Sequence, residues 1–320
     1  MNEVIKNGED LDKYLDKLQD EDDKDLIDEI SPSVESWVTA NNKDFFFSFR
    51  NVNTIQPGLY SIIYTDTSGF GLSRMTYKSE EFLHLPSLPH KDIVKDLQIF
   101  WDNKQRFLDY KLNPKRGIIL HGSPGCGKTS LIYLLVEEIK KRNGICIYFD
   151  VPQNYIEITK MVRKVEKDRP ILTIIEDIDL IIKKYGEDVF LNFLDGFNGI
   201  DNVVYVATTN NLEQIPDRIK NRPSRFDKLY EIKKPSDEDR RIYFNNKLIE
   251  ADKSKYPLEK LIKDTKGFTM AHLKEAFISL YILDNNYKES LERLKKSKLT
   301  ETNIGFDLGF DEEMDEPGQG

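Results

Sequence analysis

The sequence predicts an α/β protein whose central parallel sheet is covered by helices on both faces. Over residues 91–234, short apolar runs rich in Ile, Leu and Val alternate with helical patterns, and strands of this kind are buried on both faces of a parallel sheet. Residues 235–302 carry helical patterns only, which predicts a small helical lid. Residues 44–77 instead hold short aromatic and β-branched runs between turns, so we expect a small α+β domain over residues 1–90.

The expected N-terminal domain combines helices with a small antiparallel sheet. Residues 9–30 have Leu, Ile and Tyr side chains at helical spacing with acids between them, which predicts one or two amphipathic helices. The runs within residues 44–77 are interrupted at Pro57-Gly58 and at Ser68-Gly69, and both pairs are turn signals. Two prolines within residues 79–91 then indicate a linker.

The elements expected after this linker alternate between helix and strand. They are a helix over 93–110, a strand over 117–121, a helix from 128, a strand over 145–150, a helix over 154–166, a strand over 171–176, a helix near 187–195, a strand over 203–208 and a last strand near 229–232. In the lid, Ser236 is followed by acids, which predicts a helix with this serine as its N-cap. Residues 303–320 are too polar and glycine-rich to fold alone, so we expect a disordered acidic tail.

The composition is that of a globular protein of a reducing compartment. Hydrophobic residues make up 39% of the 320 residues and charged residues 32%. Cys126 and Cys146 are the two cysteines, too few for a disulfide framework. No apolar run approaches the roughly 18–20 residues that span a bilayer, and the acidic N-terminus lacks the pattern of a signal or transit peptide. We therefore expect a cytoplasmic protein with no membrane partner.

The net charge of −9 is unevenly distributed along the chain. Residues 1–30 contribute −8 and residues 305–320 contribute −6, which leaves +5 for the segment between them. The acidic total therefore does not exclude DNA as a partner of the middle segment, although no dense basic patch supports it.

Residues 122–129 carry the clearest chemical signal in the sequence. Gly-Ser-Pro-Gly-Cys-Gly-Lys-Thr fits the pattern G-x-x-x-x-G-K-[ST] between an expected strand and an expected helix. Its glycines let backbone N–H groups wrap phosphates, and the helix N-terminus adds its positive dipole end. We expect Lys128 to reach the β- and γ-phosphates of ATP and Thr129 to ligate Mg²⁺. The residues expected to bind nucleotide here are Gly122, Ser123, Pro124, Gly125, Cys126, Gly127, Lys128, Thr129 and Ser130.

The apolar strand expected over residues 171–176 ends in the acids Glu176 and Asp177, and P-loop ATPases deliver such acids to Mg²⁺ and to the attacking water. Here the chain resembles the classic AAA clade of the AAA+ ATPases, and its Bcs1-like branch most closely, which shares the order Glu-Asp where most members have Asp-Glu. The resemblance implies that Glu176 helps to hold the Mg²⁺ shell and that Asp177 polarises the lytic water. Because aspartate is one methylene shorter than glutamate, the water has to lie closer or be reached differently.

Two further segments match the family in the expected order. Residues 203–210 resemble the sensor-1 strand, whose terminal Asn210 would lie between the γ-phosphate and the water. Residues 217–227 resemble the segment D-P-A-L-x-R-P-G-R-F-D, in which Arg222 and Arg225 match two arginine fingers. Guanidinium groups on an exposed loop, aimed at a neighbouring subunit's γ-phosphate, would neutralise charge in the transition state.

The resemblance extends over roughly residues 92–290 and implies a homo-oligomeric, hexamer-like ring with shared active sites. Residues 267–276 resemble the lid segment G-F-S-G-A-D-L, which implies that Met270 and Ala271 approach the base and ribose. Residues 1–90 match no family that we can name, so their role stays open.

The substrate of such a ring is much less specified than its chemistry. Residues 150–157 lack the aromatic–hydrophobic–glycine triplet of protein-threading members, and Tyr155 either faces a pore or is buried. Three functions therefore stay open: an ATP-driven remodeller of proteins or protein complexes, an ATPase that acts on DNA as a loader or helicase-like motor, and a slowly hydrolysing, nucleotide-gated scaffold. The tail, with aromatic residues among acids, either docks on a partner or only solvates the chain.

Overall fold

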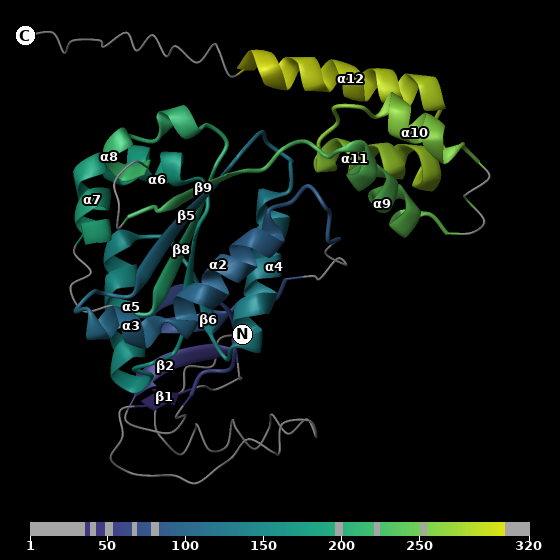
Figure 1. Cartoon of the computed structure of the whole chain (residues 1–320). Coiled ribbons are helices and arrows are strands. Elements are labelled where there is room, and N and C mark those ends of the chain that lie inside the picture. The colour runs from purple at the N-terminus through teal and green to yellow at the C-terminus, as the bar shows by residue number, and fades with distance from the viewer. Residues whose placement is uncertain are drawn as a thin grey trace, which may run out of the picture. The chain divides into compact units, whose positions relative to one another are not determined.

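One sheet contains all the strands among the residues that the structure describes (Figure 1). The computed structural model describes residues 36–38, 43–48, 54–65, 69–77, 83–195, 201–220, 225–249, 252 and 255–304. Within these residues, nine strands run in the order β1-β2-β4-β3-β6-β7-β8-β5-β9. The strands are β1 Ser36–Val38, β2 Asp44–Ser48, β3 Gly58–Thr65, β4 Gly69–Arg74, β5 Lys115–His121, β6 Ile145–Tyr148, β7 Ile171–Ile175, β8 Val203–Thr209 and β9 Lys228–Glu231.

The helices divide between two compact units. The first unit holds the sheet and comprises the described residues up to His84 with Leu88–Ser123 and Lys128–Ile232. Its helices are α2 His90–Asp102, α3 Lys104–Asp109, α4 Lys128–Lys141, α5 Pro152–Val165, α6 Ile178–Tyr185, α7 Glu187–Asp195, the 3₁₀ turn η2 Leu212–Gln214 and α8 Asp217–Lys220. The second unit comprises Leu85–Ser87, Pro124–Gly127 and the described residues from Lys233 onward. Its helices are α9 Asp237–Lys247, α10 Leu258–Asp264, α11 Met270–Phe277, the π-helical turn η4 Ile278–Ile282 and α12 Tyr287–Ile304.

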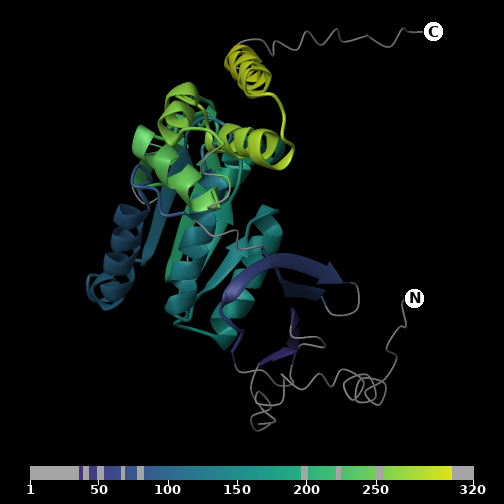
Figure 2. The ribbon, with the colours of Figure 1, turned by 90° about the vertical axis from the view of Figure 1, so that its right-hand side faces the viewer.

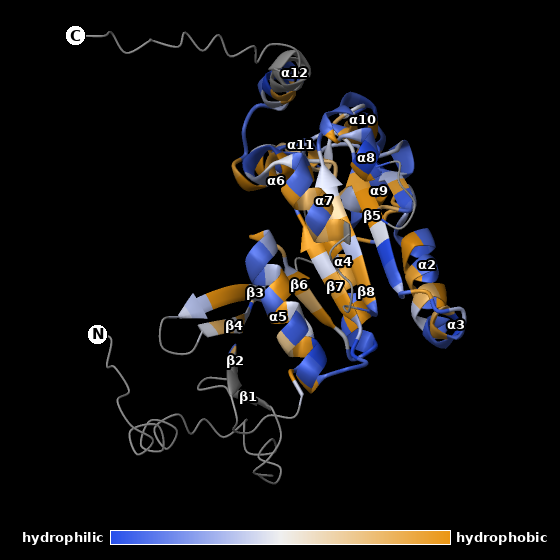
Figure 3. Ribbon diagram, turned by 90° about the vertical axis from the view of Figure 1, so that its left-hand side faces the viewer, coloured by the Kyte–Doolittle hydropathy of each residue, from blue (hydrophilic) through white to orange (hydrophobic). Residues whose placement is uncertain are grey.

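Six neighbouring strands, β3-β6-β7-β8-β5-β9 in sheet order, are parallel, and helices cover both faces of the sheet, so the predicted fold class is confirmed. Every residue of β7 and β8 is buried, as expected for apolar strands covered on both sides. Figure 3 shows these strands as apolar ribbons between helices whose polar sides face outward. Helix α4 packs against β6 and β7, whereas α5 packs with α7 and against β3 and β4. The core is therefore two-sided.

The strands before residue 77 are not a separate sheet, which corrects the expected N-terminal domain. β3 pairs in parallel with β6, so that Gly58 lies beside Ile145 and Tyr60 beside Ile147. β4 and β2 then continue the same sheet in antiparallel order (Figure 2). Tyr60 is fully buried, because this hairpin covers an edge of the parallel sheet that would otherwise be open. The helices expected over residues 9–30 lie outside the described residues.

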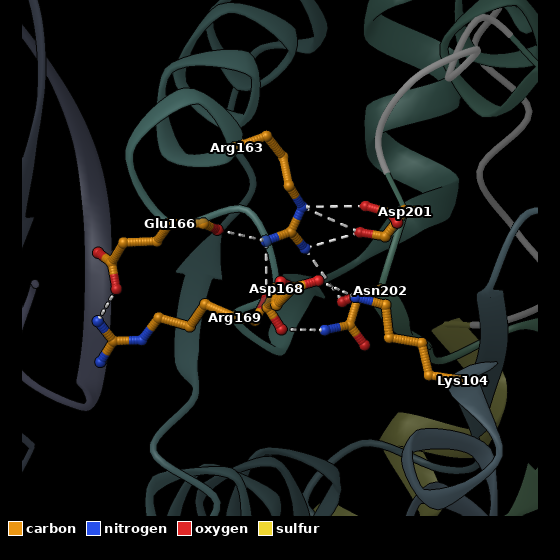
Figure 4. Close-up of polar contacts among 7 residues, drawn as sticks. All are labelled: Lys104, Arg163, Glu166, Asp168, Arg169, Asp201 and Asn202. Atoms are coloured by element: carbon orange, nitrogen blue, oxygen red, sulfur yellow. Dashed lines mark hydrogen bonds and ion pairs between the residues drawn. The ribbon is translucent and has the colours of Figure 1, made fainter. Parts of the chain in front are cut away.

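A buried polar network ties together the segments that enter the parallel strands (Figure 4). Arg163 at the end of α5 donates to the carbonyl oxygens of Arg169 (2.7 Å), Asp201 (2.7 Å) and Asn202 (3.2 Å). Arg169 in turn forms an ion pair with Glu166, and both side chains are almost fully buried. Because the network satisfies carbonyls that precede β7 and β8, it fixes where these strands begin.

The second unit is helical, and its first helix begins as the sequence predicts. Ser236 Oγ accepts from the Asp239 N–H (3.1 Å) while the Asp239 carboxylate accepts from the Ser236 N–H (2.8 Å), a capping box. Asp239 also accepts from the Ser87 N–H (3.2 Å). Burial raises the pKa of this carboxyl, but the hydrogen bonds from Ser87 and Ser236 outweigh it and hold the pKa below its ordinary value. Within the described residues, no helix combines the length and apolarity needed to cross a bilayer.

The helices differ from the expectation at two places. The helix expected over residues 93–110 is interrupted at Asn103, which separates α2 from α3. Helix α6 was not expected, because its eight residues follow the acidic strand end directly and have too short an apolar pattern to stand out.

Candidate nucleotide site

Three neighbouring parallel strands end at one edge of the sheet and carry the predicted site residues there. β5 leads into the phosphate loop, β8 leads into Asn210, and β7 leads into Glu176 and Asp177. In the sheet, β8 lies between β7 and β5. Parallel strands that share an edge bring their carboxyl ends together, so residues about 80 positions apart in the sequence meet here.

Lys128, the first residue of α4, links the phosphate loop to Asn210. Its Nζ donates to the carbonyl oxygens of Gly122 (2.7 Å) and Ser123 (3.2 Å) and to Asn210 Oδ1 (2.7 Å). The side chain is only 8% exposed. These bonds bring an ammonium group and a side-chain amide together beside the loop, and both kinds of group can donate to phosphate oxygens.

Asp177 stands at the junction of β7 and α6 in a left-handed backbone conformation, with φ of 46°. Its N–H donates to Thr208 Oγ1 (3.1 Å), and Asn210 Nδ2 lies 3.5 Å from Asp177 Oδ1. Burial raises the pKa of the Asp177 carboxyl, and the negative charges of Asp179 and Glu176 raise it further. Aspartate adopts a left-handed backbone more readily than most residues, and here that backbone places the Asp177 carboxyl beside Asn210 at the end of β7.

Glu176 is held at both carboxylate oxygens. Thr129 Oγ1 donates to Oε1 (2.8 Å), and the Tyr148 hydroxyl donates to Oε2. A hydroxyl and a carboxylate are hard oxygen ligands, and Mg²⁺ in nucleotide sites takes one or two such protein ligands together with phosphates and waters. Thr129 and Glu176 therefore fit Mg²⁺.

The glycines of the loop fit a phosphate cradle. Gly125 and Gly127 have φ of 70° and 104°, and within the second unit the Ala271 N–H donates to the Gly125 carbonyl (3.1 Å). A Cβ at position 125 would lie 2.8 Å from Ala271 Cβ, and one at position 127 would lie 3.9 Å from Met270 Cγ. The remaining predicted loop residues are exposed at Ser123, Pro124 and Ser130 and buried at Cys126. Both glycines hold backbone conformations that other residues rarely adopt, and Gly125 in addition has no room for a Cβ.

Of the two predicted arginine fingers, the structure describes one. Arg222 lies outside the described residues. The expectation of an exposed Arg225 is wrong: its side chain is 4% exposed, and Nη1 donates to the carbonyl of Arg218. The Arg225 carbonyl also packs on β5, where a Cβ at Gly117 would come within 1.9 Å of it. The start of β9 is thus fixed against β5, and Arg225 is buried with it.

Tyr155 is buried and does not face a pore. It is fully inaccessible in α5, and its hydroxyl shares a hydrogen bond with Thr173 Oγ1 of β7. Its ring packs with Phe149 and Phe193 at centroid distances of 5.6 Å. Of the two interpretations that the sequence left open, the buried one is confirmed.

Sequence reasoning missed three polar groups at this edge of the sheet: Tyr148 on Glu176, Thr208 on Asp177, and Thr209, which donates to Asp179 (2.6 Å). Each stands at or next to the end of a parallel strand whose neighbour carries a predicted site residue. A polar residue at the end of an expected parallel strand was therefore the available signal in the sequence. It points to a particular site residue only once the order of the strands in the sheet is known.

Comparison with known proteins agrees with this geometry. Residues 118–234 match the family described as ATPase family associated with various cellular activities (AAA). The chain is 26% identical over 248 residues to the ATP-dependent zinc metalloprotease FtsH of Aster yellows witches'-broom phytoplasma (strain AYWB), which covers 65% of this chain and 36% of that protein. It is 30% identical over 198 residues to the proteasome-activating nucleotidase of Aeropyrum pernix, covering 55% and 47% of the two chains. To the protein SAV of Sulfolobus acidocaldarius it is 33% identical over 194 residues, covering 52% and 24%.

The chain thus spans between about a quarter and a half of the length of these three relatives. The matched segment contains the end of β5, the phosphate loop, both strand-end acids and Asn210. Residues 118–234 are therefore similar to the AAA ATPase family.

Proposed function

We propose that this chain hydrolyses ATP in a ring of identical subunits and uses the energy to remodel a protein or protein complex. The observation that carries the proposal is the convergence of Lys128, Asn210, Asp177 and Glu176 at one edge of the sheet. Two of the relatives are named as an ATP-dependent protease and a proteasome-activating nucleotidase, and these names support a protein as the substrate.

Each residue has a distinct role in the proposed reaction. The backbone of residues 122–127 and the Lys128 ammonium bind the phosphates, and Thr129 with Glu176 holds Mg²⁺. When bound, Mg²⁺ neutralises charge that develops on the transferred phosphoryl group. Asp177 accepts a hydrogen bond from the attacking water, and Asn210 orients that water toward the γ-phosphate. Met270 and Ala271, which lie beside the loop glycines within the second unit, face the nucleotide.

The proposal includes a trans contribution from the segment that precedes β9. Arg222 is the first proposed finger. Arg225 is the second, and its guanidinium would have to leave the Arg218 carbonyl to reach a neighbouring subunit. A guanidinium delivered to a γ-phosphate stabilises transition-state charge that a single subunit leaves uncompensated.

Within the AAA+ ATPases we propose the Bcs1-like branch of the classic clade. The order Glu176-Asp177 supports it, as does the burial of Tyr155 in the segment where protein-threading members carry a pore aromatic. A remodelling step that does not thread a polypeptide through the ring agrees with both observations.

The first test separates nucleotide binding from hydrolysis. Lys128→Ala is expected to lose binding of a fluorescent ATP analogue, whereas Asp177→Asn binds the analogue normally and releases no phosphate. Lys141→Ala, on the exposed side of the same helix α4, and Asp188→Asn, exposed on α7, are the matched controls. Normal turnover by Asp177→Asn would remove the water-activating role from this residue.

The second test addresses the ring and its substrate. Mixing Lys128→Ala subunits with Arg222→Ala or Arg225→Ala subunits is expected to restore turnover, because each kind supplies what the other lacks. Assembly of both kinds without any restored turnover would contradict trans fingers. The Asp177→Asn variant, held in its ATP state, should retain a protein from native lysate. Salt-sensitive stimulation by DNA would instead favour a DNA-directed ATPase, and assembly with negligible turnover would favour a scaffold.

A further inference from the structure

Tyr148 is the last residue of β6 and reaches across to the acid that follows the neighbouring strand. β6 and β7 are parallel, with Tyr148 beside Ile174. Side chains alternate between the faces of a strand, and Ile147 packs in the core cluster that contains Tyr155 of α5. Tyr148 therefore lies on the opposite face, the one covered by α4, where Thr129 is found.

The two hydroxyls hold the two oxygens of one carboxylate. Thr129 Oγ1 donates to Glu176 Oε1 and Tyr148 donates to Glu176 Oε2. A glutamate has one more rotatable bond than an aspartate, so an unrestrained Glu176 would present its oxygens over a wider region. With Oε2 bound to Tyr148, Oε1 is directed at Thr129, the proposed cation ligand.

We propose that Tyr148 is a positioning residue for the divalent-cation site: its hydroxyl holds the longer Glu176 side chain so that one oxygen faces the ion beside Thr129. The inference rests on the proposed ATPase function and deepens it. It also gives a physical reason for the acid order Glu-Asp, because the extra methylene at position 176 is compensated by an anchor from the adjacent strand. Hydrogen-bond partners of metal-ligating groups set metal affinity in this way.

The experiment measures cation affinity rather than turnover. The Tyr148→Phe variant of the full-length protein keeps the aromatic ring of the side chain and removes only its hydroxyl. Mn²⁺ replaces Mg²⁺ as the probe, and its binding in the presence of a non-hydrolysable ATP analogue is followed by electron paramagnetic resonance. We expect the Mn²⁺ dissociation constant to rise about 10-fold, whereas the affinity for the analogue in metal-free buffer stays unchanged. Tyr185→Phe, at the end of α6 and without a bond to Glu176, serves as the matched control.

A second variant pair shows whether the effect passes through Glu176. In a Glu176→Ala background the Tyr148→Phe change is expected to leave Mn²⁺ affinity unaltered, because the group that it positions is gone. An unchanged Mn²⁺ affinity in the single variant, an equal loss in the Glu176→Ala background, or a loss of the folded state would each overturn the proposal. These outcomes are distinct from failure of the ATPase proposal, which would show as wild-type protein that neither binds nor hydrolyses ATP.

Discussion

Replacement of Glu166 by glutamine removes one charge from the network of Figure 4 while keeping the shape of the side chain. Glu166 and Arg169 form an ion pair whose side chains are 6% and 5% exposed. Glu166 Oε1 also accepts the Ile55 N–H (3.0 Å) from the segment before β3. Glutamine has one acceptor oxygen where glutamate has two, so if that oxygen accepts the Ile55 N–H, the amide NH₂ faces the Arg169 guanidinium and both the charge and one acceptor are lost. Arg169 would remain charged and buried with the Asn143 carbonyl (2.8 Å) as a neutral partner.

The expected loss of stability is about 3–5 kcal/mol, because removing one partner leaves a buried charge without its counter-charge. This is a large part of the roughly 5–15 kcal/mol by which a domain is stable. Urea unfolding followed by circular dichroism measures the change, and hydrogen exchange at the Ile55 amide reports whether the β3 segment loosens first. Glu157→Gln is the control, since Glu157 lies on the same helix α5 in an exposed pair with Lys160 (3.2 Å) and should cost below about 1 kcal/mol.

A loss below about 1 kcal/mol in Glu166→Gln would refute the reasoning, because it would mean that the Arg169 charge finds another partner or water. A double variant tests the same argument by removing both charges of the pair. In Glu166→Gln combined with Arg169→Met, both charges are gone and most of the lost stability should return. Failure of the double variant to recover would show that shape, not charge, holds this junction.

Three further outcomes are expected. Gly117→Ala should destabilise the first unit by more than the about 1–3 kcal/mol of ordinary overpacking, because its Cβ would lie 1.9 Å from the Arg225 carbonyl oxygen; a thermal melt within 2 °C of wild type would contradict it. Tyr155→Phe should cost about 1 kcal/mol through its bond to Thr173 and leave ATP turnover unchanged, so lost turnover at full stability would reopen a pore role. Because the folded-state pKa of Asp239 is lowered, its contribution is present above the unfolded pKa of about 4 and is lost as the pH falls through the folded value. Urea unfolding at pH 7 and pH 3 measures this contribution. Between the two pH values the free energy of unfolding should fall less in Asp239→Asn than in wild type, and an equal fall would show that the Asp239 carboxyl does not contribute to the acid sensitivity.

Much of the candidate site could be predicted because many of its residues are consecutive in the sequence. The octet over residues 122–129 requires a strand before it and a helix after it, and the structure has β5 and α4 there. Ser236 and the acids that follow it form the predicted cap. Such features depend on the spacing of neighbours along the chain, which the sequence shows directly.

The partners of these residues could not be predicted in the same way. Tyr148 reads as one more apolar-strand residue until β6 is known to lie beside β7. Arg225 has the same spacing from Arg222 whether it is exposed or buried, and the fold buries it, with its backbone against Gly117 and its guanidinium on the Arg218 carbonyl. In each case the deciding contact joins residues that are far apart in the sequence.

The sequence by itself therefore determined the parallel α/β class, the phosphate loop, the strand-end acids and the helical character of the second unit, because periodicity and short-range spacing encode them. Tertiary structure alone decided that the early strands extend the main sheet through β3 and β6, that Tyr155 is a core residue and that Glu176 is held between two hydroxyls. The physical reason is strand order: an apolar strand can satisfy its backbone beside several neighbours, and the choice among them rests on packing across the whole sheet.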